Sequence, residues 1–97
     1  MIPYSFDPEA ETELIEASAF FESRLPGLGK AFAASVQSVI TLIREYPEIG
    51  TPDGPSRRRV LVRRFPYAVV YEHRQDSIFV LAVAHTHRRP GYWQDRE

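Results

Sequence analysis

The chain has 97 residues, and its 43% hydrophobic content is enough for one domain over residues 1–97 with a modest core. Cysteine is absent, which excludes a disulfide framework and a thiol nucleophile. The N-terminal residues show no secretory signal and no apolar run is long enough to span a bilayer, so we expect a cytoplasmic protein without a membrane partner. The formal net charge is only −1, but it is unevenly distributed along the chain.

The first half of the chain predicts a short strand followed by two helices. Residues 2–6 alternate loosely between apolar and polar side chains, which is typical of a strand. Asp7 and Pro8 then supply an N-cap and a first helical residue. Apolar residues recur at helical spacing before a proline–glycine pair at 26–27 and again over residues 32–43. So short a link between the two runs predicts an antiparallel helical hairpin.

The second half predicts three antiparallel strands. Glycine and proline crowd residues 48–56, which we expect to be a loop. Strands are predicted at 58–63, 67–74 and 78–86, where the apolar period changes to two and the connections are short. The last strand is apolar on both faces through Val83, which predicts a place inside the sheet. The fold class is therefore α+β: a short N-terminal strand, an antiparallel helical hairpin and a three-stranded antiparallel meander.

The charge distribution predicts an anionic partner for the second half. Residues 1–56 carry three basic and nine acidic side chains, whereas residues 57–97 carry nine basic and four acidic ones. All nine of these basic side chains are arginine, which grips carboxylate and phosphate groups in a planar, bidentate manner. The partner would be a nucleic acid or an acidic protein. The alternative is an arginine-rich sheet edge that is merely solvated.

Histidines and the aromatic tail are the candidates for chemistry. His85 and His87 share a strand parity, but two histidines without a cysteine or an acidic cluster make weak ligands, so we expect no metal and no cofactor. His85 can end a buried strand with its ring hydrogen-bonded, or it can transfer protons, because an unperturbed histidine titrates near neutral pH. Tyr92 and Trp93 either fold back to cover the sheet or stay exposed as a contact patch.

Three stretches of the second half, residues 60–72, 78–85 and 88–93, carry a resemblance to a known family. They include the motifs Arg-Phe-Pro-Tyr-x-Val-x-Tyr, which starts at Arg64, and His-x-x-Arg-x-Pro-x-Tyr-Trp, which starts at His85. With these motifs the chain resembles the RelE/ParE superfamily, the toxins of type II toxin–antitoxin systems. The resemblance covers essentially the whole chain, since the family also has a short first strand and a helical hairpin. It implies a small cytoplasmic growth inhibitor held silent by a cognate antitoxin.

The superfamily divides by target, and the resemblance leaves two activities open. ParE-like members poison DNA gyrase, whereas RelE-like members cleave messenger RNA on the ribosome. Such nucleases usually carry one arginine after the tyrosine that opens a strand, where this chain has Ala68, and another after the last strand, where it has His85 or Thr86. The acidic helical half also disfavours docking deep into ribosomal RNA. We favour a ParE-like gyrase inhibitor rather than an enzyme; the alternatives are the endoribonuclease and an antitoxin binder without toxicity.

Each of these readings predicts its own set of residues. The residues expected to contact the cellular target lie in the tail, and they are Arg88, Arg89, Tyr92 and Trp93. The residues expected to bind carboxylates of the antitoxin lie in and after the first strand of the meander, and they are Arg57, Arg58, Arg59, Arg63 and Arg64. A nuclease must activate a ribose hydroxyl, stabilise a pentavalent phosphate and protonate the leaving oxygen. The candidates for those roles are Arg59, Arg64, His85, Arg88 and Tyr92.

Overall fold

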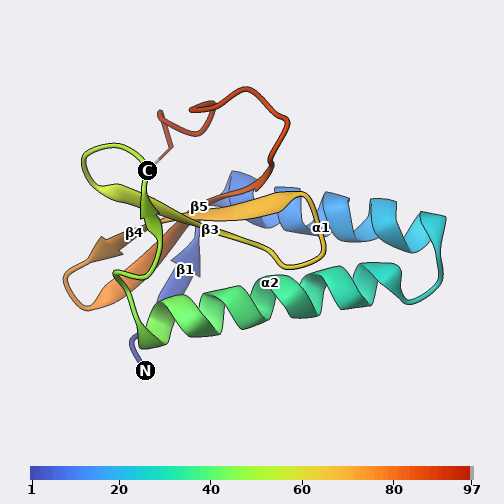
Figure 1. Ribbon diagram of the computed structural model, residues 1–97, viewed down its shortest axis with the longest axis horizontal. Coiled ribbons are helices and arrows are strands. Elements are labelled where there is room, and N and C mark those ends of the chain that lie inside the picture. Colours follow the sequence, from blue (N-terminus) through green and yellow to red (C-terminus); the bar gives the residue numbers. More distant parts are fainter. Residues whose placement is uncertain (97) are drawn as a thin grey trace.

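A five-stranded sheet carries a helical hairpin on one face in the computed structural model, which describes residues 1–96 (Figure 1). The elements in chain order are β1 (Tyr4–Phe6), α1 (Pro8–Arg24), α2 (Leu28–Glu45), β2 (Thr51–Pro52), β3 (Arg57–Leu61), β4 (Tyr67–Arg74) and β5 (Ser77–His85). The strand order is β1-β5-β4-β3-β2, with β1 parallel to β5 and the other neighbouring pairs antiparallel. The predicted α+β class with its helical hairpin is confirmed.

Two features of the sheet extend the predicted three-stranded meander. β1 joins the sheet beside β5, with Phe6 opposite Val80. The segment 48–56, which we expected to be a loop, contains the two-residue strand β2, and this strand pairs with Arg58 and Arg59. A strand of two residues shows no alternation, and a proline in it is tolerated because the strand lies at the edge of the sheet. The pairing of β1 with β5 could not be predicted either, because the two strands are far apart in the sequence and a local apolar pattern does not specify which strands pair.

The helical hairpin has a clear local cause. Asp7 caps α1, since its carboxylate accepts a hydrogen bond of 2.9 Å from the Glu9 amide. Near the turn, Glu22 accepts hydrogen bonds from the Gly27 and Gly29 amides at 2.8 and 3.0 Å. These hydrogen bonds, the one from Gly27 above all, outweigh the effect of burial and lower the pKa of Glu22.

Neither helix within the described residues has the length and apolar character that crossing a membrane requires.

Both faces of the sheet are covered, each by a different part of the chain. The face toward the hairpin packs against the apolar side of α2, whose buried residues are Phe32, Val36, Val39, Ile40 and Ile43. The opposite face packs against Trp93 from the C-terminal tail, residues 86–96, and its buried residues are Val70, Leu81, Ala82 and Ala84. The tail therefore folds back across the side of the sheet that the helices leave open (Figure 1).

Candidate functional site at the tail

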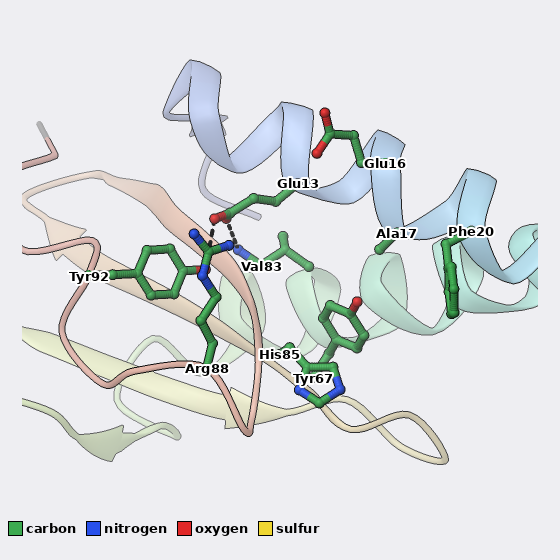
Figure 2. A pocket seen from close by; sticks show the side chains of 9 residues that line it. All are labelled: Glu13, Glu16, Ala17, Phe20, Tyr67, Val83, His85, Arg88 and Tyr92. Atoms are coloured by element: carbon green, nitrogen blue, oxygen red, sulfur yellow. Dashed lines mark hydrogen bonds between the residues drawn. The ribbon is translucent and has the colours of Figure 1, made fainter.

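The C-terminal tail meets α1 and β5 at the carboxylate of Glu13. Tyr92 Oη donates a hydrogen bond of 2.7 Å to Glu13 Oε2, and the Val83 amide donates one of 3.0 Å to Oε1 (Figure 2). Arg96 donates from Nη1 to Oε1 and from Nη2 to Oε2, each at 3.1 Å. The Glu13 side chain is only 14% exposed. It is therefore a largely buried anion whose two oxygens are both satisfied.

The edge of β5 explains why a carboxylate and a guanidinium meet here. β1 pairs with β5 only as far as Val80, so the strand edge beyond that residue has no strand beside it within residues 1–96. At this edge Glu13 accepts a hydrogen bond from the Val83 amide. Arg96 Nη1 donates a hydrogen bond of 2.9 Å to the Leu81 carbonyl oxygen. Buried backbone groups need hydrogen-bond partners. The two side chains thus take the place of a longer β1.

Two guanidinium groups lie close to the aromatic ring of Tyr92. The Cζ atoms of Arg88 and Arg96 are 4.2 and 5.1 Å from the ring centroid. Burial raises the pKa of the Tyr92 phenol, and the hydrogen bond and charge of Glu13 raise it further, which makes this phenol a poor proton donor. Burial alone would lower the pKa of Arg96, but the hydrogen bond and charge of Glu13 outweigh it and raise that pKa.

A small pocket of about 200 Å³ opens beside Glu13, between α1 and the tail (Figure 2). Its lining includes Phe20 from α1 and Tyr67 and His85 from the sheet. The rings of Tyr67 and His85 meet edge to face, with their centroids 5.1 Å apart. The His87 amide donates a hydrogen bond of 3.0 Å to His85 Nδ1. His85 is thus hydrogen-bonded at the end of its strand. No three His, Asp or Glu side chains within residues 1–96 gather closely enough to hold a metal ion.

The predicted target-binding residues share one stretch of chain but differ in exposure. Arg88 and Arg89 are exposed, and Tyr92 is partly buried. Trp93 is buried, at 6% exposure, so its ring covers the sheet, as one of its two predicted roles required. In this conformation its ring has little surface to offer a partner. The accessible part of the set is therefore the pair of arginines, together with the exposed part of Tyr92.

The five arginines predicted to bind the antitoxin fall into two groups. Arg57 and Arg58 already form ion pairs within the chain. Arg57 Nε lies 3.1 Å from a carboxylate oxygen of Glu72, and Arg58 Nη2 lies 2.9 Å from one of Glu48. Arg58 also donates to two backbone carbonyl oxygens of the segment before β2. The three side chains classed as exposed are Arg59, Arg63 and Arg64. Arg64 adopts a φ of 69°, a left-handed conformation that non-glycine residues adopt infrequently.

Arg63 and Arg64 border an apolar groove between α2 and β3. The groove has a volume of about 650 Å³, and its apolar lining is Val39, Leu42, Val60 and Leu61. Leu61 is 64% exposed although it belongs to a strand. β2 pairs only with Arg58 and Arg59, so no strand within residues 1–96 lies beside Leu61 on the outer edge of β3. This edge can accept a further strand.

The candidate nuclease residues are only partly brought together. Arg59, His85 and Arg88 line one cavity of about 170 Å³ on the tail side of the sheet. Tyr92 lines the neighbouring pocket together with His85 and Arg88, but its hydroxyl is bonded to Glu13. Arg64 instead lines the groove between α2 and β3. The five side chains thus do not surround a common point.

Sequence reasoning missed Glu13 and Arg96 as members of this site. Glutamates near the start of a helix are expected from the helix dipole alone, so the position of Glu13 did not suggest a further role. A signal was available for Glu13, because it lies three residues after Ala10 and four before Ala17, both of which are buried. A carboxylate on the apolar face of a helix requires a partner. For Arg96 we find no comparable local signal.

Comparisons with known proteins agree with the fold described above. The family model described as ParE toxin of type II toxin-antitoxin system, parDE, matches residues 4–90. No curated protein matches the chain. The structure titled Chromosomal ParDE TA system from P. aeruginosa is similar with a TM-score of 0.63 and 18% identity, over 88% of this chain and 96% of that one. The isolated E. coli RelE toxin is similar with a TM-score of 0.70 and 20% identity, over 97% of this chain and 94% of that one.

At these identities the two structures support the fold alone, and the fold is common to both branches of the superfamily. The match to the family model is the more specific finding, because it extends over most of the chain. It includes β1, the helical hairpin and all of the strands that follow. The chain belongs to the ParE toxin family of type II toxin–antitoxin systems.

Proposed function

We propose that this toxin inhibits DNA gyrase in the cytoplasm and does so without cleaving RNA. The observation that carries the proposal is that the candidate nuclease residues do not all lie at one site. Arg64 lies in a different cavity from His85 and Arg88, and the phenol of Tyr92 is bonded to Glu13 with a raised pKa. General acid–base cleavage needs a proton acceptor and a proton donor on the two sides of one phosphate. His85 and Arg88 share a pocket with Tyr92, but the Tyr92 hydroxyl is already engaged by Glu13 and Arg64 lies elsewhere, so the full set does not meet at one phosphate.

The position after the strand-opening tyrosine supports the same branch. RelE-like nucleases usually carry an arginine there, whereas this chain has Ala68, which is 3% exposed. An arginine at that place would have to reach out of the sheet beside Val70 and Ala84, where Trp93 now packs. One observation favours the rival nuclease, namely the cavity that Arg59, His85 and Arg88 share. An anion in that cavity would meet the guanidinium groups of Arg59 and Arg88, and His85 is the side chain there that could transfer a proton.

The surface proposed to meet gyrase is the tail around Arg88 and Arg89. Both guanidinium groups are exposed, and arginine and tyrosine are enriched where protein interfaces gain most of their affinity. Tyr92, which is partly buried, adds its exposed part, while Trp93 anchors the segment to the sheet. The complementary surface of the target is expected to carry carboxylates or phosphates, because these accept bidentate hydrogen bonds from arginine.

We further propose that the antitoxin occupies the groove between α2 and β3. Its neutralising segment would run along the outer edge of β3 as an extra strand, with apolar side chains over Leu61 and carboxylates near Arg63 and Arg64. A segment that is disordered when free would order on this surface. Binding only the folded toxin must raise its melting temperature. Failure of the neighbouring gene product to co-purify, with no change in melting temperature, would contradict this partnership.

The experiment on gyrase uses purified toxin and one matched variant. Wild-type toxin is titrated into a supercoiling reaction with gyrase, and cleaved DNA is measured in the same samples. We expect inhibition by the wild type and weaker inhibition by Arg88→Ala with Arg89→Ala, at an unchanged circular dichroism spectrum. A wild-type protein that arrests growth but leaves gyrase fully active would contradict the proposal.

A further inference from the structure

The carboxylate of Glu13 joins three parts of the molecule: the helix that carries it, the edge of β5 and the C-terminal tail (Figure 2). We infer that Glu13 is a positioning residue, which acts through Tyr92 to hold Arg88 in the place where it meets the target. This inference rests on the proposed role of the tail in target binding. Glu13 itself is largely buried, so its role would be exercised through Tyr92.

The first step of the argument is the chain of contacts from Glu13 to Arg88. The hydrogen bond of 2.7 Å fixes the phenol end of Tyr92 against α1. The guanidinium group of Arg88 then lies 4.2 Å from the centroid of that ring. A cation is attracted electrostatically to the face of an aromatic ring, so the position of this ring favours one position of the Arg88 guanidinium group. If Tyr92 leaves Glu13, Arg88 loses the surface that supports it.

The second step is the reason why a carboxylate is needed. Both oxygens of Glu13 accept, and each receives one of the two Arg96 bonds. Glutamine in the same place would replace one carboxylate oxygen with an amide NH₂ group. That group donates hydrogen bonds, and it would face other N–H or O–H donors. Arg96, whose side chain is 9% exposed, would then keep only Glu9 as a carboxylate partner, at 3.2 Å, and that side chain is 74% exposed. Its buried charge would lack adequate compensation.

The competing explanation is that Glu13 only adds stability. Trp93 packs on the sheet independently of Glu13, and that packing could hold the tail in place. In that case Glu13→Gln lowers the melting temperature but leaves the potency of the folded toxin unchanged. A positioning role predicts instead that the losses of potency are not additive: once Arg88 has been replaced, Glu13→Gln causes no further loss.

The test is a double-mutant cycle between Glu13→Gln and Arg88→Ala, with Glu11→Gln as the matched control. Glu11 lies on the same helix, is exposed, and loses the same charge. Potency is the expression level of soluble toxin that halves the growth rate. The chain's single tryptophan, Trp93, reports the position of the tail through its fluorescence emission.

We expect Glu13→Gln to fold, to shift the Trp93 emission to longer wavelength and to lose about tenfold in potency, the loss of one charged hydrogen bond. The double variant should be no weaker than Arg88→Ala alone, and Glu11→Gln should match the wild type. Full potency of Glu13→Gln, or additive losses with Arg88→Ala, overturns the positioning role while the proposed target contact stands. Full potency of Arg88→Ala refutes the target contact itself.

A second variant covers the case in which Glu13→Gln does not fold. Tyr92→Phe removes only the hydroxyl that donates to Glu13, and it keeps the ring beneath Arg88. The same loss of potency and the same absence of additivity with Arg88→Ala are expected. A folded Tyr92→Phe protein with the potency of the wild type overturns the inference.

Discussion

Trp93 anchors the C-terminal tail on the sheet, and the cost of removing its side chain can be worked out. It is 6% exposed, and it packs against Val70, Leu81, Ala82 and Ala84. A buried aromatic side chain withdraws about 150–250 Å² from water, which at about 25 cal/mol per Å² corresponds to about 4–6 kcal/mol. The tail lies at the surface and can settle into the space left behind, so we expect Trp93→Ala to lower the free energy of unfolding by about 3–5 kcal/mol.

Urea-induced unfolding followed by far-ultraviolet circular dichroism measures this cost, because the substitution removes the chain's single tryptophan as a fluorescence probe. Domains of this kind have a total stability of about 5–15 kcal/mol, so the expected loss is a large share of it. The control is Trp93→Phe, which keeps an aromatic ring and should lose much less. A loss below about 1 kcal/mol for Trp93→Ala would refute the packing argument, since exposed side chains behave in that way.

Three further predictions concern the charged and titratable residues. His85→Ala should leave growth arrest unchanged at matched soluble expression, because gyrase inhibition transfers no proton; a nuclease would lose about 10²–10⁴ in rate. Arg88→Ala with Arg89→Ala should keep the melting temperature and reduce toxicity, and a folded, fully toxic variant would exclude the tail as the contact. Burial alone would raise the pKa of Glu72, but hydrogen bonds from two arginines outweigh it and hold that pKa below its usual range. Wild-type stability should therefore fall as the pH drops through and below the usual carboxylate range, and Glu72→Gln should flatten that loss in acid unfolding curves.

The elements that could be predicted from the sequence are those whose signal is local. α2 has apolar residues at regular helical spacing, and β5 is apolar on both faces, so each was found close to its observed bounds. β2 escaped detection because two residues have no period and one of them is proline. The parallel pairing of β1 with β5 joins segments more than 70 positions apart, such as Tyr4 with Ile78, and no local pattern encodes that choice.

The site was only half predictable for the same reason. Arg88, Arg89 and Tyr92 could be proposed from the sequence because they lie together in one charged, aromatic stretch of the chain. The residues that position them are distant: Tyr92 and Glu13 are 79 positions apart, and Arg96 and Glu13 are 83 positions apart. Such pairs become neighbours only through the fold. A glutamate in a helix reads as solvated surface until the packing of that helix is known.

The most direct measurement of the central claim places one preparation of the toxin in two reactions. In the first, the protein is incubated with gyrase and plasmid DNA, and supercoiling and DNA cleavage are measured. In the second, it is incubated with ribosomes programmed with messenger RNA, and cleavage at each codon is mapped. We predict loss of supercoiling, with accumulation of gyrase-cleaved DNA, and an intact message. Cleaved message with fully active gyrase would contradict the account and assign the toxin to the nuclease branch.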